Sequence, residues 1–262
     1  MEKIKHYARE NIAYWSKRAS GYSDVNQQEL ASDQKTVWSQ MLFHQIMKHY
    51  EGRQPQSLKV LDIGTGPGFF AIILAKMGFS VTGVDYTENM LKEAKHNAGV
   101  LADRIDFRKM DAMALDFPEN SFDVIVSRNV TWNLPDPREA YRQWTRVLKP
   151  GGLLLNFDAN WYRYLYDDAA MDSHLQDREN VARTAVEDDT AGTDVAAMEA
   201  IARKAPLSAK DRPKWDEKVL GNFGMTVLSD TDIWKTVWTR AERINNASTP
   251  MFLVRAVKSV VS

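Results

Sequence analysis

Three glycines at alternate positions follow a short apolar stretch and form the most informative feature of the sequence. Val60–Ile63 has the composition of a buried strand, and Phe69–Met77 has that of a helix packed behind it. Gly64, Gly66 and Gly68 lie between them. Glycine lets the backbone turn sharply and approach a ligand closely, because it has no Cβ atom. This segment therefore predicts a ligand-binding loop between a strand and a helix.

The spacing and charge of this loop indicate which ligand it binds. The pattern G-x-G-x-G differs from the G-x-G-x-x-G that is typical of dinucleotide-binding loops. Asp62 precedes the first glycine by two residues, and a carboxylate there repels a pyrophosphate but attracts an amine. The loop thus favours a cationic adenosyl ligand over a nicotinamide dinucleotide.

Further acidic side chains follow the next two predicted strands. Asp85 ends the second strand, 17 residues after Gly68, where a carboxylate can accept hydrogen bonds from both hydroxyls of a ribose. Tyr86 and Met90 can flank a purine ring. Asp111 follows the third strand and can accept the exocyclic amine of adenine. Taken alone, Asp85 could instead cap a helix and Asp111 could stabilise a turn.

Strand and helix patterns alternate from residue 58 onward, which is typical of a parallel sheet covered by helices on both faces. Two helical patterns, Ala8–Ala19 and Glu29–Tyr50, precede them. Thr87 and Asp136 are predicted N-caps of later helices. The predicted strands are Lys59–Ile63, Ser80–Asp85, Ile105–Lys109, Phe122–Ser127, Gly152–Asp158, Met225–Ser229 and Phe252–Val257.

The same patterns divide the chain into four segments. Residues 1–54 form an N-terminal helical cap, and residues 55–160 form the ligand-binding core. Residues 161–222 hold many charges and helix formers, so they are predicted to be a helical insertion that covers the substrate. Residues 223–262 return the chain to the core sheet as its final strands.

The order of these features resembles the class I S-adenosyl-L-methionine-dependent methyltransferases, in particular the small-molecule, ubiquinone-biosynthesis-like group. The resemblance covers about residues 55–160. It includes Leu148–Gly152 (Leu-Lys-Pro-Gly-Gly), which leads into the fifth strand in that family. Phe223–Asp230 and Pro250–Lys258 fit the family's final antiparallel strand pair more loosely. The resemblance implies an α/β fold with a Rossmann-like, doubly wound seven-stranded sheet, mostly parallel with one antiparallel strand.

The resemblance also implies the residues that bind S-adenosyl-L-methionine and its product S-adenosyl-L-homocysteine. Asp62 and the loop Gly64–Gly68 would hold the methionine part, and Asp85 would hold the ribose. An aromatic N-terminal segment would close over the cofactor, with Tyr14 and Tyr22 as contacts, although both could simply pack between helices. The predicted cofactor-binding residues are Tyr14, Tyr22, Asp62, Gly64, Thr65, Gly66, Gly68, Asp85, Tyr86, Met90, Asp111, Ala112, Met113, Arg128 and Asn129.

Residues after the fourth and fifth strands are expected where an acceptor would approach the methyl group. Asp158 is the first candidate for a base or a substrate anchor, and Asn129 is a second catalytic candidate near the methionine end. Aromatic side chains indicate a partly apolar or cationic acceptor, although Trp132 could instead pack against the insertion. Of the histidines, only His174 in the insertion could reach a substrate. The predicted substrate-binding residues are Trp132, Asn133, Trp161 and Tyr162.

The composition excludes several classes of chemistry and partner. The chain of 262 residues has no cysteine, which removes thiolate nucleophiles, cysteine-ligated zinc and iron–sulfur clusters. We expect no metal site. The net charge of -1 gives no reason to expect nucleic acid or an anionic membrane as partner. We expect a cytoplasmic location because no segment resembles a signal peptide or a membrane span. The long N-terminal helices could serve a homodimer.

These observations predict an enzyme that transfers a methyl group to a small-molecule acceptor by in-line displacement. Positioning can supply much of the rate acceleration, and a base is needed only when the nucleophile is protonated at neutral pH. Two alternatives remain at this stage. One is a dinucleotide-dependent oxidoreductase on a similar sheet, and the other is a non-catalytic protein that binds S-adenosyl-L-methionine. The sequence does not indicate the acceptor atom.

Overall fold

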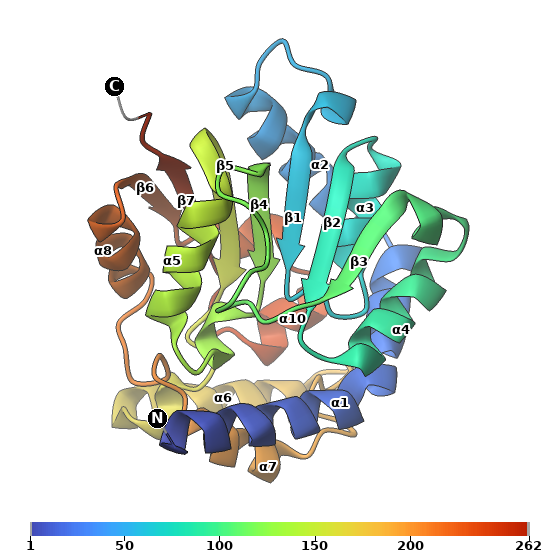
Figure 1. Cartoon of the computed structure of the whole chain (residues 1–262). Helices are drawn as coiled ribbons and strands as arrows, with labels where there is room; N and C mark the ends of the chain where they lie inside the picture. Colours follow the sequence, from blue (N-terminus) through green and yellow to red (C-terminus); the bar gives the residue numbers. More distant parts are fainter. Residues whose placement is uncertain (1, 261–262) are drawn as a thin grey trace.

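A seven-stranded sheet forms the centre of the molecule (Figure 1). Its strands are β1 (Lys59–Ile63), β2 (Ser80–Asp85), β3 (Ile105–Lys109), β4 (Phe122–Arg128), β5 (Leu148–Asp158), β6 (Met225–Asp230) and β7 (Phe252–Lys258). The computed structural model describes residues 2–260 and gives the order β3-β2-β1-β4-β5-β7-β6. β7 is antiparallel to β5 and β6, and the other pairs are parallel. The predicted doubly wound sheet is confirmed.

The two central strands position the candidate site. β1 and β4 are almost entirely buried, as expected of strands covered on both faces. In the parallel part of the sheet, Ile63 at the end of β1 lies opposite Val84 in β2 and Ser127 in β4. The strand order reverses between β1 and β4, and ligands of such sheets bind beyond the strand ends at this reversal. The segments that follow β1, β2 and β4 therefore meet at one edge.

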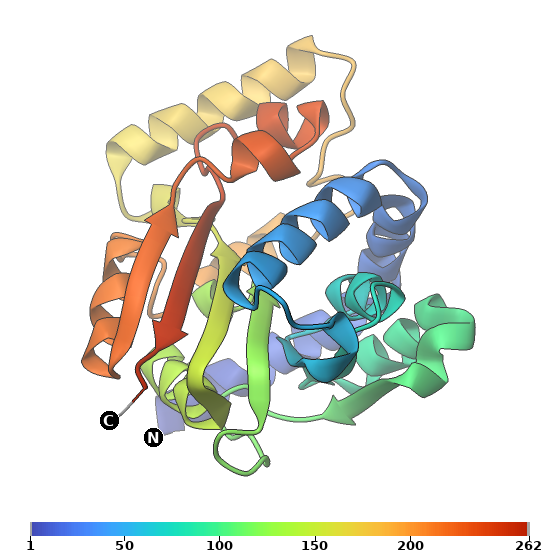
Figure 2. The ribbon, with the colours of Figure 1, turned by 90° about the horizontal axis from the view of Figure 1, so that it is seen from above.

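Helices cover both faces of the sheet (Figure 2). α2 and α3 contribute Trp38 and Ile73 to the apolar core on one face, whereas α5 and α8 contribute Trp144 and Leu220 on the other. Asp136 accepts a hydrogen bond from the backbone of Glu139, which confirms it as the N-cap of α5. The helices are α1 (Glu2–Ala31), α2 (Gln34–His49), α3 (Phe69–Lys76), α4 (Glu88–Ala98), α5 (Pro137–Val147), α6 (Asp168–Arg183), α7 (Val195–Ala202), α8 (Lys214–Asn222), α9 (Trp234–Val237) and α10 (Arg240–Asn245).

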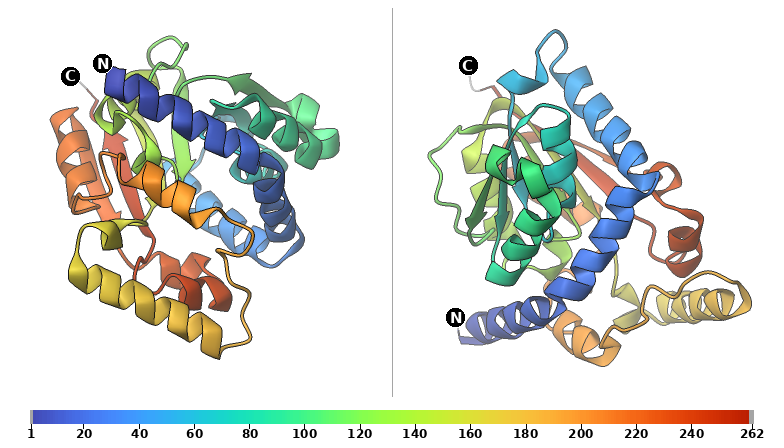
Figure 3. Two further views of the ribbon diagram at one scale, coloured as in Figure 1. Left: turned by 90° about the horizontal axis from the view of Figure 1, so that it is seen from below. Right: turned by 90° about the vertical axis from the view of Figure 1, so that its right-hand side faces the viewer.

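The N-terminal segment differs from the prediction of helices over Ala8–Ala19 and Glu29–Tyr50. The first helix, α1, continues without a break to Ala31. The polar residues between the predicted helices do not end it, because Ser23 and Asn26 are buried against the rest of the chain. Those contacts offset the cost of Gly21, about 1 kcal/mol relative to alanine within a helix. α1, α6 and α7 lie on the side of the sheet at which β1 and β2 end (Figures 1 and 3).

The C-terminal half also departs from the predicted segments. α8 was expected within the insertion but packs on the sheet through Val219 and Leu220. α9 and α10 were not predicted, and they separate β6 from β7. α10 lies beside α6 of the insertion (Figure 2). Within residues 2–260, no helix is long and apolar enough to cross a membrane.

Candidate functional site

A pocket opens at the edge where β1 and β4 diverge, and it encloses about 1150 Å³, part of which is open to solvent. Its position agrees with the rule for ligand sites in doubly wound sheets. Most of the predicted cofactor-binding residues meet there. The lining residues from that set are Tyr22, Asp62, Gly64, Thr65, Gly66, Asp85, Tyr86, Met90, Asp111, Ala112, Met113, Arg128 and Asn129.

Two of the three glycines in the loop approach the pocket. Gly64 and Gly66 have φ angles of 66° and 52°, which favour glycine. A Cβ atom on Gly64 would lie 2.3 Å from a methyl carbon of Val130, so no larger residue fits there without movement. Gly68 does not line the pocket, which corrects its predicted role. A Cβ atom on Gly68 would lie 3.1 Å from that of Ala94, so Gly68 permits α3 and α4 to pack closely.

Asp62 is buried at the floor of the pocket beneath the glycine loop. Its Oδ2 atom accepts hydrogen bonds from the Thr65 hydroxyl at 2.6 Å and from the backbone N–H of Ala71 at 3.0 Å. Burial raises the pKa of Asp62 to about 7, despite these hydrogen bonds. No ion pair to Asp62 occurs in the described part of the chain. Its charge is therefore available to a cationic ligand at neutral and higher pH.

Asp85 ties the end of β2 to the glycine loop. Its Oδ2 atom accepts from the backbone N–H of Gly66 at 3.0 Å, and its Oδ1 atom accepts from both the N–H and the hydroxyl of Thr87 at 2.9 Å. Desolvation by burial raises the pKa of Asp85. Thr87 occupies the N-cap position of α4 as predicted, but its hydroxyl donates to Asp85 and its side chain makes no cap hydrogen bond.

Asp111 was interpreted from the sequence either as a residue that stabilises a turn or as part of the ligand site, and the structure is consistent with both. Asp111 stabilises a turn, because its Oδ1 atom accepts from the backbone N–H of Met113 at 2.8 Å. It also lines the pocket together with Ala112 and Met113. Tyr86 and Met90 line the pocket from the β2–α4 connection, and Tyr86 is largely exposed whereas Met90 is buried.

One face of α1 covers the pocket. Asn11, Trp15, Tyr22 and Asn26 line it at spacings of four, seven and four residues, which places them on one side of a helix. Tyr14 lies outside this face and packs among the apolar residues beside Trp132, which corrects its predicted cofactor contact. Asn11, Trp15 and Asn26 were not predicted from the sequence as residues of the site. Their helical period was the available signal, but the predicted break in α1 concealed it.

Arg128 supplies positive charge to the pocket wall, but Glu29 of α1 neutralises it. The guanidinium donates two hydrogen bonds to the Glu29 carboxylate, at 2.7 and 2.9 Å. It also lies 4.6 Å from the ring centre of Phe69 and 5.4 Å from that of Trp38. This pair joins α1 to the end of β4, and it leaves the pocket with the net negative charge of its aspartates.

Asn129 follows Arg128 and has a φ angle of 59°, which is unusual for a residue other than glycine. Its side-chain Oδ1 atom is buried and has no hydrogen-bond partner in the part of the chain that the structure describes. Asn133 also lines the pocket, and its backbone carbonyl accepts from the Tyr7 hydroxyl at 2.9 Å. Amide groups therefore line the pocket beyond the aspartates.

Residues 61–156 match the sequence model of a family described as a methyltransferase domain. This range runs from β1 into β5 and contains the glycine loop with Asp85, Asp111 and Asn129. Residues 61–156 therefore form a methyltransferase domain. The predicted resemblance is thereby confirmed.

Curated relatives agree with this assignment. A demethylmenaquinone methyltransferase of Staphylococcus aureus is 34% identical over 129 residues, which cover 48% of this chain and 51% of that protein. A sterol 24-C-methyltransferase of Gibberella zeae is 33% identical over 138 residues, or 50% of this chain and 35% of that protein. The chain therefore matches about half or less of the length of these relatives.

Solved structures with low sequence identity to this chain share its fold. A structure from Methanococcus maripaludis, proposed to be an S-adenosyl-L-methionine-dependent methyltransferase, superposes with a TM-score of 0.57. The two proteins are 20% identical, and the match covers 94% of each chain. At this identity the likeness establishes the shared fold and no more.

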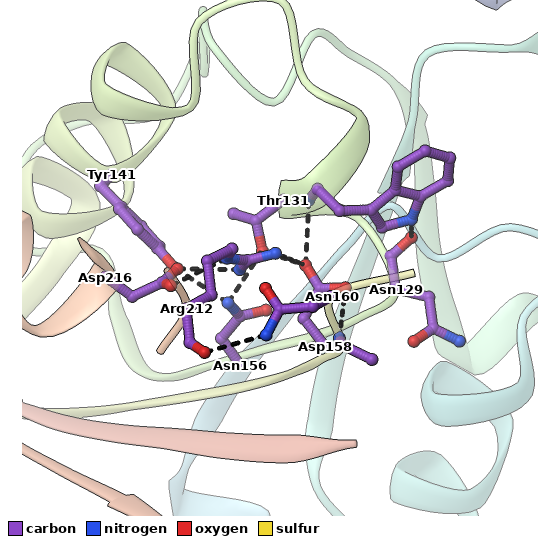
Figure 4. Close-up of polar contacts among 10 residues, drawn as sticks. Asn129, Thr131, Tyr141, Asn156, Asp158, Asn160, Arg212 and Asp216 are labelled. Atoms are coloured by element: carbon purple, nitrogen blue, oxygen red, sulfur yellow. Dashed lines mark hydrogen bonds and ion pairs between the residues drawn. The ribbon is translucent and has the colours of Figure 1, made fainter. Parts of the chain in front are cut away.

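Asp158 is not among the residues that line the pocket. Figure 4 shows its carboxylate directed toward Arg212. Asp158 is fully buried and forms an ion pair with Arg212 at 2.8 Å. Its Oδ2 atom also accepts from the Thr131 hydroxyl and from the backbone N–H of Trp132. These contacts occupy the carboxylate, so Asp158 is not placed to act as a base. Arg212, which holds it, was not singled out from the sequence.

The predicted substrate-binding aromatic residues form an apolar cluster between the domain and the insertion. Trp132 is buried and its ring centre lies 5.0 Å from that of Tyr162. The cluster includes Met198 and Ile201 of α7, so the alternative that Trp132 packs against the insertion is the correct one. Trp161 packs at its margin and contacts Trp238. None of the three aromatic residues lines the pocket.

Two remaining predictions concern His174 and a metal. His174 does not reach the pocket, because its ring stacks on that of Tyr164 with 3.9 Å between the ring centres. Burial lowers the pKa of His174. Within residues 2–260, no group of three or more histidine, aspartate or glutamate side chains is arranged to hold a metal ion.

Proposed function

We propose that this chain binds S-adenosyl-L-methionine in the pocket and transfers its methyl group to a small-molecule acceptor. One observation carries the proposal. Asp62, Asp85 and Asp111 line a single pocket beside a glycine loop, and none has an ion-pair partner among the described residues. Such a pocket attracts a cationic nucleoside and repels a pyrophosphate.

The contacts of each aspartate leave it able to bind part of this ligand. A carboxylate has about four acceptor positions. The three hydrogen bonds of Asp85 leave one position on its Oδ2 atom, which can accept a ribose hydroxyl. The Oδ2 atom of Asp111 can accept the adenine amine, since only Oδ1 binds the Met113 backbone. Asp62 and Asn129 lie where the ligand's ammonium group would bind, and Asp62 supplies the opposite charge.

When bound, S-adenosyl-L-methionine supplies a methyl group on a sulfonium that an acceptor can displace in line. The chain contributes position and shielding. The α1 face that contains Asn11 and Trp15 covers the pocket, which limits access of water. Holding the two reactants in line can lower the barrier by several kcal/mol. The two curated relatives are named for small-molecule acceptors, which supports an acceptor of that class.

Titration calorimetry with S-adenosyl-L-homocysteine tests the binding part of this proposal. We expect wild-type protein to bind and Asp85→Ala to bind about 30-fold more weakly, the cost of one hydrogen bond to a charged group. Asp106→Ala is the matched control, because Asp106 is a half-exposed carboxylate on β3 that pairs only with Arg108. Absence of binding by the wild type, or equal binding by Asp85→Ala, would contradict the proposal.

Transfer itself needs a separate measurement. Incubation with S-adenosyl-L-methionine labelled on the methyl group, across a panel of small acceptors, should yield labelled product that Asp85→Ala does not form. Binding without transfer to any acceptor would favour a non-catalytic protein. Binding of NADH in preference to S-adenosyl-L-homocysteine would favour an oxidoreductase.

A further inference from the structure

A buried group of polar side chains joins the segment before α8 to the segment after β4 (Figure 4). We call it the Arg212 cluster; its members are Thr131, Tyr141, Asn156, Asp158, Arg212 and Asp216. The Arg212 guanidinium donates one hydrogen bond to Asp158 and two to Asp216, each 2.8 Å long. Two carboxylates thus share one cation, and the Tyr141 hydroxyl supplies a further donor to Asp216.

The Arg212 cluster connects to the pocket through Trp132. The Oδ2 atom of Asp158, which binds Arg212, also accepts from the backbone N–H of Trp132 at 2.9 Å. The indole N–H of Trp132 donates in turn to the backbone carbonyl of Asn129 at 3.1 Å. A continuous series of hydrogen bonds therefore runs from Arg212 to the pocket wall.

Asn129 needs such support because its backbone conformation is unfavourable. A residue other than glycine with φ near 59° persists only when surrounding contacts hold it. Two backbone contacts do so, namely the Trp132 indole on its carbonyl and the carbonyl of Phe157 on its N–H, at 2.8 Å. In this conformation Asn129 lines the pocket, and its buried Oδ1 atom has no partner within residues 2–260.

We propose that Arg212 is a positioning residue for the methyl-transfer site, acting through Asp158 and Trp132 on the amide of Asn129. This inference rests on the proposed function, because the ligand that Asn129 faces is the proposed cofactor. A buried ion cluster is a poor source of stability, since desolvation cancels most of the attraction. Its geometry instead fixes orientation, because Arg212 makes four hydrogen bonds in fixed directions.

A double-mutant cycle on S-adenosyl-L-homocysteine affinity tests the proposal. Trp132→Phe keeps an aromatic ring but removes the indole N–H, and Arg212→Lys keeps the charge but cannot make the four bonds. We expect each to weaken binding about fivefold, the effect of one net hydrogen bond. Asn129→Gly removes the amide that these residues position. In the Asn129→Gly background, both substitutions should therefore leave affinity unchanged.

The outcomes separate this inference from the proposed function. Arg183→Gln is the control, because Arg183 is an exposed residue of α6 whose loss should change nothing. If the wild type binds but the effects of Trp132→Phe and Asn129→Gly simply add, the positioning role is wrong. If the wild type does not bind, the proposed function fails, and this inference fails with it. Should Arg212→Lys not fold, Trp132→Phe alone decides, because it leaves the ion pairs intact.

Discussion

Carboxylates lie at the carboxyl ends of β1, β2 and β5, at the same edge of the sheet, yet the two sides of the site use them differently. Asp62 near the end of β1 and Asp85 at the end of β2 accept hydrogen bonds only from N–H and hydroxyl groups. Asp158, at the end of β5, is paired with the guanidinium of Arg212. All three side chains lie at carboxyl ends of strands on the same edge of the sheet. Their place in the sheet alone therefore does not determine their roles.

The difference lies in the source of the compensating charge. Around Asp158, the chain itself supplies the cation, and the result is an internal structural cluster. Around Asp62, burial without a cation raises the pKa to about 7, which makes ionisation costly until a positive ligand arrives. Perturbed carboxyl groups in a cleft are typical of functional sites, whereas a paired and buried carboxylate is typical of structure.

The largest expected effect comes from removing the cation of the Arg212 cluster. Arg212→Ala leaves two buried carboxylates without their partner and should lower the free energy of unfolding by about 3–5 kcal/mol. Urea denaturation followed by circular dichroism measures this. A loss below about 1 kcal/mol would show that Arg212 is not needed to neutralise the two buried carboxylates.

Removing the charge of Asp62 should instead increase the stability of the folded protein. The native pKa is raised, so the folded protein binds a proton more tightly than the unfolded chain, and stability falls as pH rises toward 7. Asp62→Asn should therefore raise the melting temperature at pH 8 more than at pH 5. A substitution that destabilises the protein equally at both pH values would contradict the assignment.

Ligand binding should reveal the same ionisation. Because the carboxylate attracts the ligand only when it is ionised, affinity for S-adenosyl-L-homocysteine should fall as pH drops below about 7, by at most about tenfold per pH unit. Asp62→Asn should weaken binding at pH 8 by about 2 kcal/mol and flatten the pH dependence. Calorimetry from pH 5.5 to pH 8.5 compares the two proteins, and a parallel pH profile would argue against Asp62 as the titrating group.

Substitutions of two neighbouring aromatic residues on α1 should have smaller and different effects. Tyr14 and Trp15 both pack against the apolar cluster beside α7, but of the two only Trp15 lines the pocket. Trp15→Ala should weaken S-adenosyl-L-homocysteine binding by about tenfold, consistent with loss of one aromatic contact. Tyr14→Ala should instead lower the melting temperature and leave affinity within about twofold. Reversed results would place Tyr14 at the ligand, as the sequence first predicted.

The smallest effect should come from an exposed ion pair. Arg183 contacts Glu179 one helical turn earlier on α6, and both side chains are largely exposed. Solvent screening limits such pairs, so Arg183→Gln should change the free energy of unfolding by less than about 0.5 kcal/mol. The same denaturation experiment serves as a baseline for Arg212→Ala.

The amino-acid sequence by itself determined the sheet and the edge at which the pocket lies. All seven strands lie where the patterns placed them, within a few residues. The central strands β1 and β4 are covered on both faces and are therefore largely apolar, whereas the edge strands β3 and β6 are more exposed and more polar. The glycine loop and the acidic residues Asp62, Asp85 and Asp111 were found for a related reason. These residues lie at the ends of strands or directly after them, so their positions along the chain are enough to identify them.

Only the tertiary structure decided which side chains line the pocket and which contact one another. Tyr14 and Trp15 are adjacent in sequence, and the docking of α1 alone determines which lines the pocket. Asp158 and Arg212 are 54 residues apart, and neither carries a local signal of the other. Periodicity reports whether a residue is buried. It does not identify the partner, because that depends on how distant elements pack.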